Sequence, residues 1–175
     1  MKKEDKIIKQ LTEELNSSDE NIVLKALTKI RDKGKTAILP PMFDLFEQTD
    51  NPKIKEEITS ILNDIKDSYA LDPIIERLKT GSNELNNVLL ASLWNSKLNA
   101  VDFLPEIVET ATKGDYMNAL EALTVIENLD GPFLNEKLSE AEFLLQDYLS
   151  ENTGDKATLL QSLLDIIHEY QANAY

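Results

Sequence analysis

The chain has 175 residues, contains no cysteine and carries a formal net charge of −14. Without cysteine, disulfides, thiolate metal sites and a cysteine nucleophile are excluded. Residues 1–35 are slightly basic, so the rest of the chain, with nine Lys/Arg against 25 Asp/Glu, is strongly acidic. Because phosphate backbones and anionic lipids bind basic surfaces, this disfavours nucleic acid and membranes and favours a protein partner with a basic or neutral surface.

The acid could equally serve solubility alone, and composition does not separate the two roles. The amino-terminal run is too charged for a secretory signal, and no segment approaches membrane-spanning length. We therefore expect one soluble domain, residues 1–175, in the cytoplasm, as a monomer or weak homodimer.

Helix signals follow one another along the chain, with neither an Asn-Gly hairpin nor a sustained apolar–polar alternation to indicate strands. The pattern predicts an all-α fold with a first helix near 3–16, four helix pairs and a last helix near 155–171. The expected pairs are 19–33 with 39–49, 52–66 with 72–80, 84–97 with 102–113, and 116–129 with 133–150.

The four pairs share a period of 32 residues. One column consists of the prolines Pro41, Pro73 and Pro105. A second column holds the expected N-caps, Asp19, Asn51, Asn83 and Asp115. Two apolar columns one helical turn apart follow the caps: Ala26, Ile58, Leu90 and Ala122, then Ile30, Leu62, Trp94 and Ile126. The period divides the chain into an N-terminal cap (1–18), repeats 19–50, 51–82, 83–114 and 115–152, and a C-terminal cap (153–175).

Prolines and glycines fall where helices tolerate them. Pro52 follows the cap Asn51 and takes the first helical position, where its missing N–H would have no partner anyway. Asp72 and Pro73 are expected to act in the same way for the next helix. The other prolines are also expected in first turns: Pro40, Pro41, Pro105 and Pro132. The glycines are expected where helices stop: Gly34, Gly81, Gly114, Gly131 and Gly154.

The stretch DNPKIKEEITSIL (50–62) resembles the first helix of the HEAT family of α-helical repeats, with Asp/Asn and Pro before an apolar and then a basic residue. NIVLKALTKI (21–30) is similar. The resemblance covers roughly residues 19–130; it departs where Asn86 and Asn87 replace the basic residue, and where the fourth unit loses its proline. It implies a right-handed α-solenoid (α–α superhelix) of about four helix pairs with a capping helix at each end.

Catalytic motifs are incomplete in this sequence. His168 is the single histidine, and HEYQA lacks the second histidine of a zinc-binding helix. GKT at Gly34–Thr36 is similar to the end of a phosphate-binding loop, but Lys29 stands where its first glycine belongs. Paired carboxylates are expected on solvent-facing sides of helices: Glu56 with Glu57, Glu106 with Glu109, and Glu136 with Glu140. We expect no enzyme and no cofactor or metal site.

Trp94 shares its column with Ile30, Leu62 and Ile126, so we expect it in the core, although tryptophan is also favoured at binding hot spots. Its helix is apolar around most of its circumference, which favours burial in the middle of the array.

By resemblance to the HEAT family, the protein is expected to be a non-enzymatic scaffold or adaptor that grips a partner protein with the second helices of its pairs, on the concave side. Five carboxylates are expected on the exposed side of these helices: Asp44, Glu47, Glu76, Glu106 and Glu109. They would bind a basic partner surface. Other HEAT-like proteins are DNA glycosylases or pigment lyases, so an enzyme or enzyme accessory is the alternative. A self-associating module using Tyr148, Tyr170 and Tyr175 is another.

Overall fold

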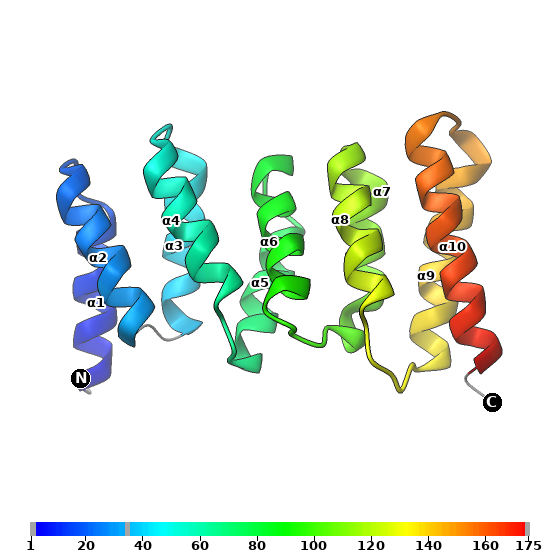
Figure 1. The fold of residues 1–175 in the computed structure, drawn as a ribbon, viewed down its shortest axis with the longest axis horizontal. Helices are drawn as coiled ribbons and strands as arrows, with labels where there is room; N and C mark the ends of the chain where they lie inside the picture. The colour runs from blue at the N-terminus through cyan, green and yellow to red at the C-terminus, as the bar shows by residue number, and fades with distance from the viewer. Residues whose placement is uncertain (1–2, 34–35, 174–175) are drawn as a thin grey trace.

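The computed structural model of the chain describes residues 3–33 and 36–173, and these residues form ten α-helices and no β-strand (Figure 1). The all-α prediction is therefore confirmed. The helices are α1 (Lys3–Leu15), α2 (Glu20–Lys33), α3 (Leu39–Gln48), α4 (Pro52–Asn63), α5 (Leu71–Leu78), α6 (Asn83–Asn95), α7 (Leu104–Lys113), α8 (Tyr116–Glu127), α9 (Asn135–Glu151) and α10 (Asp155–Asn173). Short 3₁₀ turns precede α3, α5 and α7: η1 (Thr36–Ile38), η2 (Ser68–Ala70) and η3 (Val101–Phe103).

Every observed helix boundary lies within about three residues of the expected one, because caps, prolines and glycines mark most helix ends locally in the sequence. Asn51 caps α4 by accepting from the amides of Lys53 and Ile54, and Asp115 caps α8 by accepting from Asn118. Asp19 accepts from the amide of Asn21 at the start of α2.

The expected cap Asn83 is wrong by one residue. Ser82 has the extended backbone of a cap, and its hydroxyl accepts from the amide of Leu85, so Asn83 becomes the first residue of α6. Asp72 is not a cap either. Because the 3₁₀ turn η2 leads directly into α5, that helix begins at Leu71 and Asp72 lies inside its first turn.

Pro52 is the first residue of α4, as expected. Pro41, Pro73 and Pro105 all lie within the first three residues of α3, α5 and α7, positions that need no intrahelical N–H bond. The expectation for Pro132 is wrong, since it lies in the connection before α9. Of the expected helix stops, Gly34 is outside the described residues.

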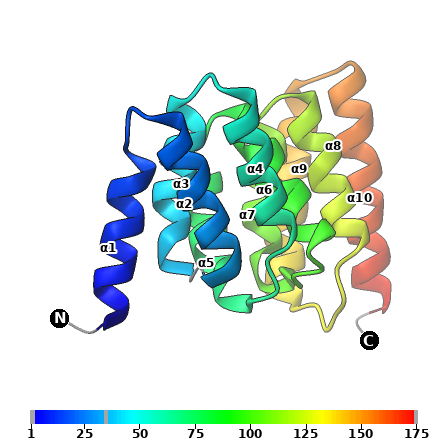
Figure 2. The same ribbon diagram turned by 60° about the vertical axis from the view of Figure 1, so that its left-hand side comes forward.

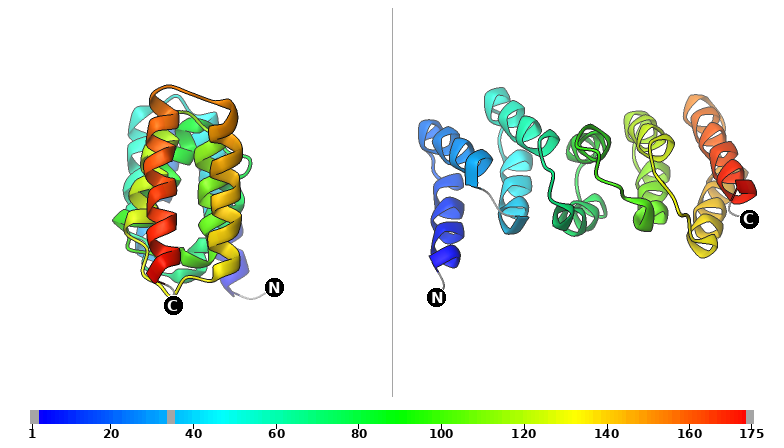
Figure 3. Two further views of the ribbon diagram at one scale, coloured as in Figure 1. Left: turned by 90° about the vertical axis from the view of Figure 1, so that its right-hand side faces the viewer. Right: turned by 60° about the horizontal axis from the view of Figure 1, so that its bottom comes forward.

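The helices form two layers, which are seen end-on in the left panel of Figure 3. The even-numbered layer contains α2, α4, α6, α8 and α10, and the odd-numbered layer contains α1, α3, α5, α7 and α9; within each layer, successive helices are in contact (Figures 1 and 2). Across the layers α1 packs on α2, α3 on α4, α5 on α6, α7 on α8 and α9 on α10. Helices α1 and α10 lie at opposite ends of the row (Figure 1).

One continuous apolar core lies between the layers. The predicted column of Ala26, Ile58, Leu90 and Ala122 is completely buried. Phe43 and Ile107 contribute from the odd-numbered layer. Burial of each large aliphatic side chain contributes about 1.5–3 kcal/mol, so this shared core holds the row of helices together. The polar sides of the helices are left to form the candidate surfaces.

Candidate binding surface

All five predicted site carboxylates lie on the odd-numbered layer. Asp44 and Glu47 belong to α3, Glu76 to α5, and Glu106 and Glu109 to α7. Since α3 contacts α5 and α5 contacts α7, these residues form a band across three neighbouring helices. Their surroundings divide them into two groups.

Asp44 and Glu47 are joined to α5 by Arg77. The Nη2 atom of Arg77 lies 2.7 Å from Oδ1 of Asp44 and 2.8 Å from Oε2 of Glu47. The other oxygen of Glu47 accepts from the backbone amide of Ser82 at 2.7 Å. These two carboxylates therefore connect α3 to α5 and to the start of α6, and they are engaged within the protein. Sequence reasoning missed Arg77, whose spacing of about one period from both acids is the signal that would have found it.

Glu76 and Glu109 have basic neighbours on their own helices. Lys79 lies 3.0 Å from Glu76, and this hydrogen bond is the main cause that raises the pKa of Lys79. Lys113 forms the corresponding ion pair with Glu109. Such exposed pairs within one helix are weak and exchange readily with solvent or a partner. With Arg77, these two lysines reduce the formal charge of the five-carboxylate band to −2.

Glu76 and Glu106 line one hollow between α5 and α7. It has a volume of about 410 Å³, and its wall includes Pro73, Ile75 and Phe103. The Oε2 atom of Glu106 is buried and, within the described residues, has no hydrogen-bond partner. Glu106 thus departs from the expectation of a fully solvated carboxylate. Asp72 and Lys79 line the hollow as well, so it combines three carboxylates and one lysine with an apolar wall.

Trp94 is not in the core. Its side chain is 38% exposed, whereas Ile30, Leu62 and Ile126 of the same column are buried. The indole Nε1–H donates to Oε2 of Glu121 on α8 at 2.9 Å, which places the ring over the groove between α6 and α8. The neighbouring Leu90 and Leu93 fill the core instead, since the amphiphilic indole needs a hydrogen-bond acceptor that the apolar interior lacks.

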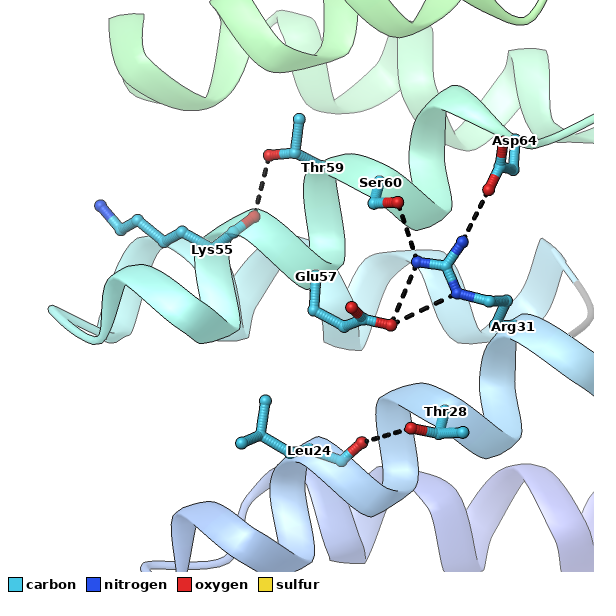
Figure 4. Close-up of polar contacts among 8 residues, drawn as sticks. All are labelled: Leu24, Thr28, Arg31, Lys55, Glu57, Thr59, Ser60 and Asp64. Atoms are coloured by element: carbon cyan, nitrogen blue, oxygen red, sulfur yellow. Dashed lines mark hydrogen bonds and ion pairs between the residues drawn. The ribbon is translucent and has the colours of Figure 1, made fainter.

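On the even-numbered layer, Arg31 joins α2 to α4 (Figure 4). Its Nε and Nη2 atoms donate to Oε1 of Glu57 at 3.3 and 3.1 Å, and its Nη1 atom donates to Asp64 at 2.6 Å. Nη2 also donates to the hydroxyl of Ser60 at 2.9 Å. The planar guanidinium is thereby held by Glu57 and Ser60 of α4 and by Asp64, the C-cap of the same helix.

The aromatics considered for self-association are partly used inside the protein. The Tyr170 hydroxyl donates to the carbonyl of Ile126 at 2.7 Å, and its ring stacks on Phe133 with centroids 4.1 Å apart. Tyr148 lies under the ammonium of Lys156, 4.7 Å from the ring centroid. Tyr175 lies outside the described residues.

His168 lies on the exposed side of α10, where its Nε2 is 3.2 Å from Oε1 of Glu142. Gln171 donates to the other oxygen of Glu142, and this bond, with the contact to His168, lowers the pKa of Glu142. In the part of the chain that the structure describes, His, Asp and Glu side chains form no group of three placed to hold a metal ion. Over the same residues, no helix has the length and apolar character needed to cross a membrane.

Comparisons of the chain with protein-family models, with curated proteins and with solved structures found no match.

Proposed function

We propose that the protein is a non-enzymatic scaffold or adaptor, built as a HEAT-like right-handed solenoid, that binds a basic segment of a partner protein at the hollow between α5 and α7. The observation that carries this proposal is the meeting of Glu76 and Glu106 with Pro73, Ile75 and Phe103 in one hollow. Carboxylates steer a basic partner to the surface, and the apolar wall supplies contact area that holds it.

The proposal is narrower than the five-residue site that the sequence predicts. Asp44 and Glu47 hold Arg77 and contribute to the packing of α3 on α5, so they are assigned a structural role. Glu109 is paired with Lys113 at the edge of the band. It contributes to the negative electrostatic potential of this surface and does not line the hollow. Glu76 and Glu106 are the residues assigned to direct contact.

The test is affinity capture from native lysate with three proteins: the natural chain, the double variant Glu76→Gln/Glu106→Gln, and the control Glu136→Gln/Glu140→Gln, which removes two exposed acids of α9. We expect a basic partner to be recovered by the natural chain and the control, in a salt-sensitive manner, and to be lost with the double variant. Equal recovery of the same proteins by all three chains would contradict the proposal.

Self-association is a second candidate because α9 carries an exposed apolar side chain, Phe143, which is 67% exposed. Exposed apolar groups of this kind often lie in interfaces. Light scattering over a dilution series, on the natural chain and on Phe143→Ser, tests this candidate. Self-association requires that the natural chain forms a dimer and that the variant does not.

A further inference from the structure

The grooves between neighbouring helices of the even-numbered layer are here called seams. Two of these seams have a hollow at the C-terminal ends of their helices, lined by residues at equivalent positions of the repeat. One hollow lies in the α2–α4 seam and another in the α6–α8 seam. Their lining residues are related by 64 residues, two periods of the sequence: Ile30 and Trp94, Arg31 and Asn95, Asp64 and Asn128, Lys66 and Asp130. Asp64 and Asn128 are also the C-caps of their helices, which fixes the correspondence independently.

The α2–α4 seam is closed by its own arginine. Arg31 bonds Glu57, Ser60 and Asp64 on the far side of the seam, and the hollow left beside it has a volume of about 160 Å³. The seam therefore shows the arrangement with which this fold receives a guanidinium: a carboxylate, a hydroxyl and the C-cap side chain, all on one helix.

The α6–α8 seam keeps the acceptors and lacks the arginine. Two periods after Glu57, Ser60 and Asp64 stand Glu121, Thr124 and Asn128, each of which carries a side-chain oxygen. The position of Arg31 is taken by the short, neutral Asn95. The hollow beside these residues is larger, at about 550 Å³, and of the three acceptors Asn128 is the one that lines it. In the intervening α4–α6 seam the carboxylate position is the buried Leu89, so the same acceptor set does not occur there.

Trp94 and Glu121 are arranged so that they could bind a guanidinium group together. The indole N–H occupies Oε2 of Glu121, and within the described residues the other oxygen, Oε1, receives no hydrogen bond. The ring itself is exposed, and a tryptophan face attracts a cation that lies over it. A planar guanidinium can stack on the ring and bond a carboxylate at the same time, which an ammonium does less well.

The electrostatic surroundings favour a cation as well. The hollow lies at the C-terminal ends of α6 and α8, where the helix dipoles place partial negative charge. Glu127 and Asp130 line it and outnumber its one lining cation, Lys97.

We propose that the α6–α8 seam binds an arginine side chain of a partner protein, whose guanidinium takes the place that Arg31 occupies in the α2–α4 seam. The guanidinium bonds Glu121 and Asn128 and stacks on Trp94. This subsite is on the opposite layer from the hollow between α5 and α7, so it goes beyond the proposed function, and each site is tested without the other.

Trp94 is the only tryptophan of the chain, so its indole N–H gives a single, assignable NMR signal. The experiment follows this signal while the ¹⁵N-labelled full chain is titrated with Nα-acetyl-arginine amide, with the uncharged isostere Nα-acetyl-citrulline amide, and with Nα-acetyl-lysine amide. We expect a saturable shift with the arginine amide, a several-fold weaker response to the lysine amide and none with the citrulline amide.

Two variants and one control sharpen the test. Glu121→Gln retains an oxygen for the indole but loses the charge, and should weaken arginine binding about tenfold. Asn95→Arg supplies the guanidinium from α6 itself, so it should abolish the titration shift. Because it adds a partly buried ion pair, it should also raise the melting temperature by a few degrees. Glu136→Gln on α9 should change neither.

The proposal is overturned if the arginine amide gives no saturable shift, or if the citrulline or lysine amide matches it. It is also overturned if Glu121→Gln and Asn95→Arg both bind the arginine amide as the natural chain does. Variants of Glu76 and Glu106 should leave this titration unchanged, so a failed capture experiment at the α5–α7 hollow has no bearing on the result.

Discussion

Between α1 and α6, neighbouring helices are joined mainly by ion pairs, whereas between α6 and α10 the joining bonds run mainly from side chains to backbone carbonyls. The first group consists of Glu14 with Lys29, Arg31 with Glu57 and Asp64, Lys55 with Glu84, and Arg77 with Asp44 and Glu47. The second consists of Asn118 to the carbonyl of Asn83, Lys156 to those of Thr112 and Gly114, and Tyr170 to that of Ile126.

Charge distribution along the chain explains the difference. Residues 1–87 hold 14 Lys/Arg and 17 Asp/Glu, whereas residues 88–175 hold four and 15. With four Lys/Arg for 15 Asp/Glu, the second half has too few cations to pair most of its carboxylates, so its helices are connected largely through carbonyls. Both proposed contact sites include carboxylates from this half, Glu106 and Glu121. The four predictions below test the contrast, beginning with the largest effect.

Asn118→Asp should cost about 3 kcal/mol or more of unfolding free energy at neutral pH. Asn118 is completely buried, and its Nδ2 donates to the carbonyl of Asn83 at 2.9 Å, so an aspartate would place a carboxylate against an acceptor without water. Burial would raise the pKa of the new carboxyl, and the loss should shrink as the pH falls and the group becomes protonated.

Denaturant unfolding over a range of pH measures this effect. The control is Asn135→Asp, at an exposed position in the first turn of α9, which should be close to neutral. A loss in Asn118→Asp that is as small as in the control would show that the carbonyl bond does not hold α8 to α6.

Arg77→Met should cost about 1–2 kcal/mol at low ionic strength. The variant keeps most of the apolar stem and removes the bonds to Asp44 and Glu47, which leaves two acids close together. Because those side chains are partly exposed, the cost should decrease in high salt. Unfolding in low and high salt is the measurement, and Lys79→Met, which breaks only an exposed pair within α5, should have a much smaller effect. A salt-independent cost would remove the distinction between the two halves.

Tyr170→Phe should cost about 1 kcal/mol, since it removes the bond to the Ile126 carbonyl and retains the ring that stacks on Phe133. Burial, with smaller contributions from Glu127 and Glu169, raises the pKa of Tyr170 above its ordinary value of 10.0. The natural chain therefore has the full contribution of this phenol below pH 10.0 and loses it as the pH rises through the higher folded pKa. The difference between the natural chain and the variant, measured by denaturant unfolding, should close in that alkaline range; a constant difference would contradict this.

Glu142→Gln should have the smallest effect, about 0.5 kcal/mol or less, because the carboxylate is near the surface. Hydrogen bonds from Gln171 and, to a lesser extent, His168 lower the pKa of Glu142 below its ordinary 4.5. Its contribution is present above pH 4.5 and is lost as the pH falls through the lower folded pKa. Thermal unfolding of both proteins on either side of pH 4.5 gives the comparison, and stabilisation by the natural carboxylate only at acid pH would refute the assignment.

Local sequence signals predicted the helices well and their side-chain contacts poorly. Asn51, Asp115 and Pro52 act within one helical turn, so their roles followed from spacing alone. Asn83 was misassigned because Ser82, also a good cap, directly precedes it. Trp94 was misassigned because one period column cannot show that α8 offers Glu121 as an acceptor at the surface. The five predicted acids lie on the neighbouring helices α3, α5 and α7, but the period columns did not point to Arg77, which bonds two of them.

The amino-acid sequence by itself determined the all-helical class and nearly every helix boundary, because caps, prolines and apolar spacing act between residues only a few positions apart. The tertiary structure alone decided which carboxylates are engaged, which line a hollow and which seam is bridged by an arginine. Those outcomes depend on contacts such as Arg31 with Asp64 and Trp94 with Glu121, which join residues about one period apart and form only when neighbouring helices pack in register.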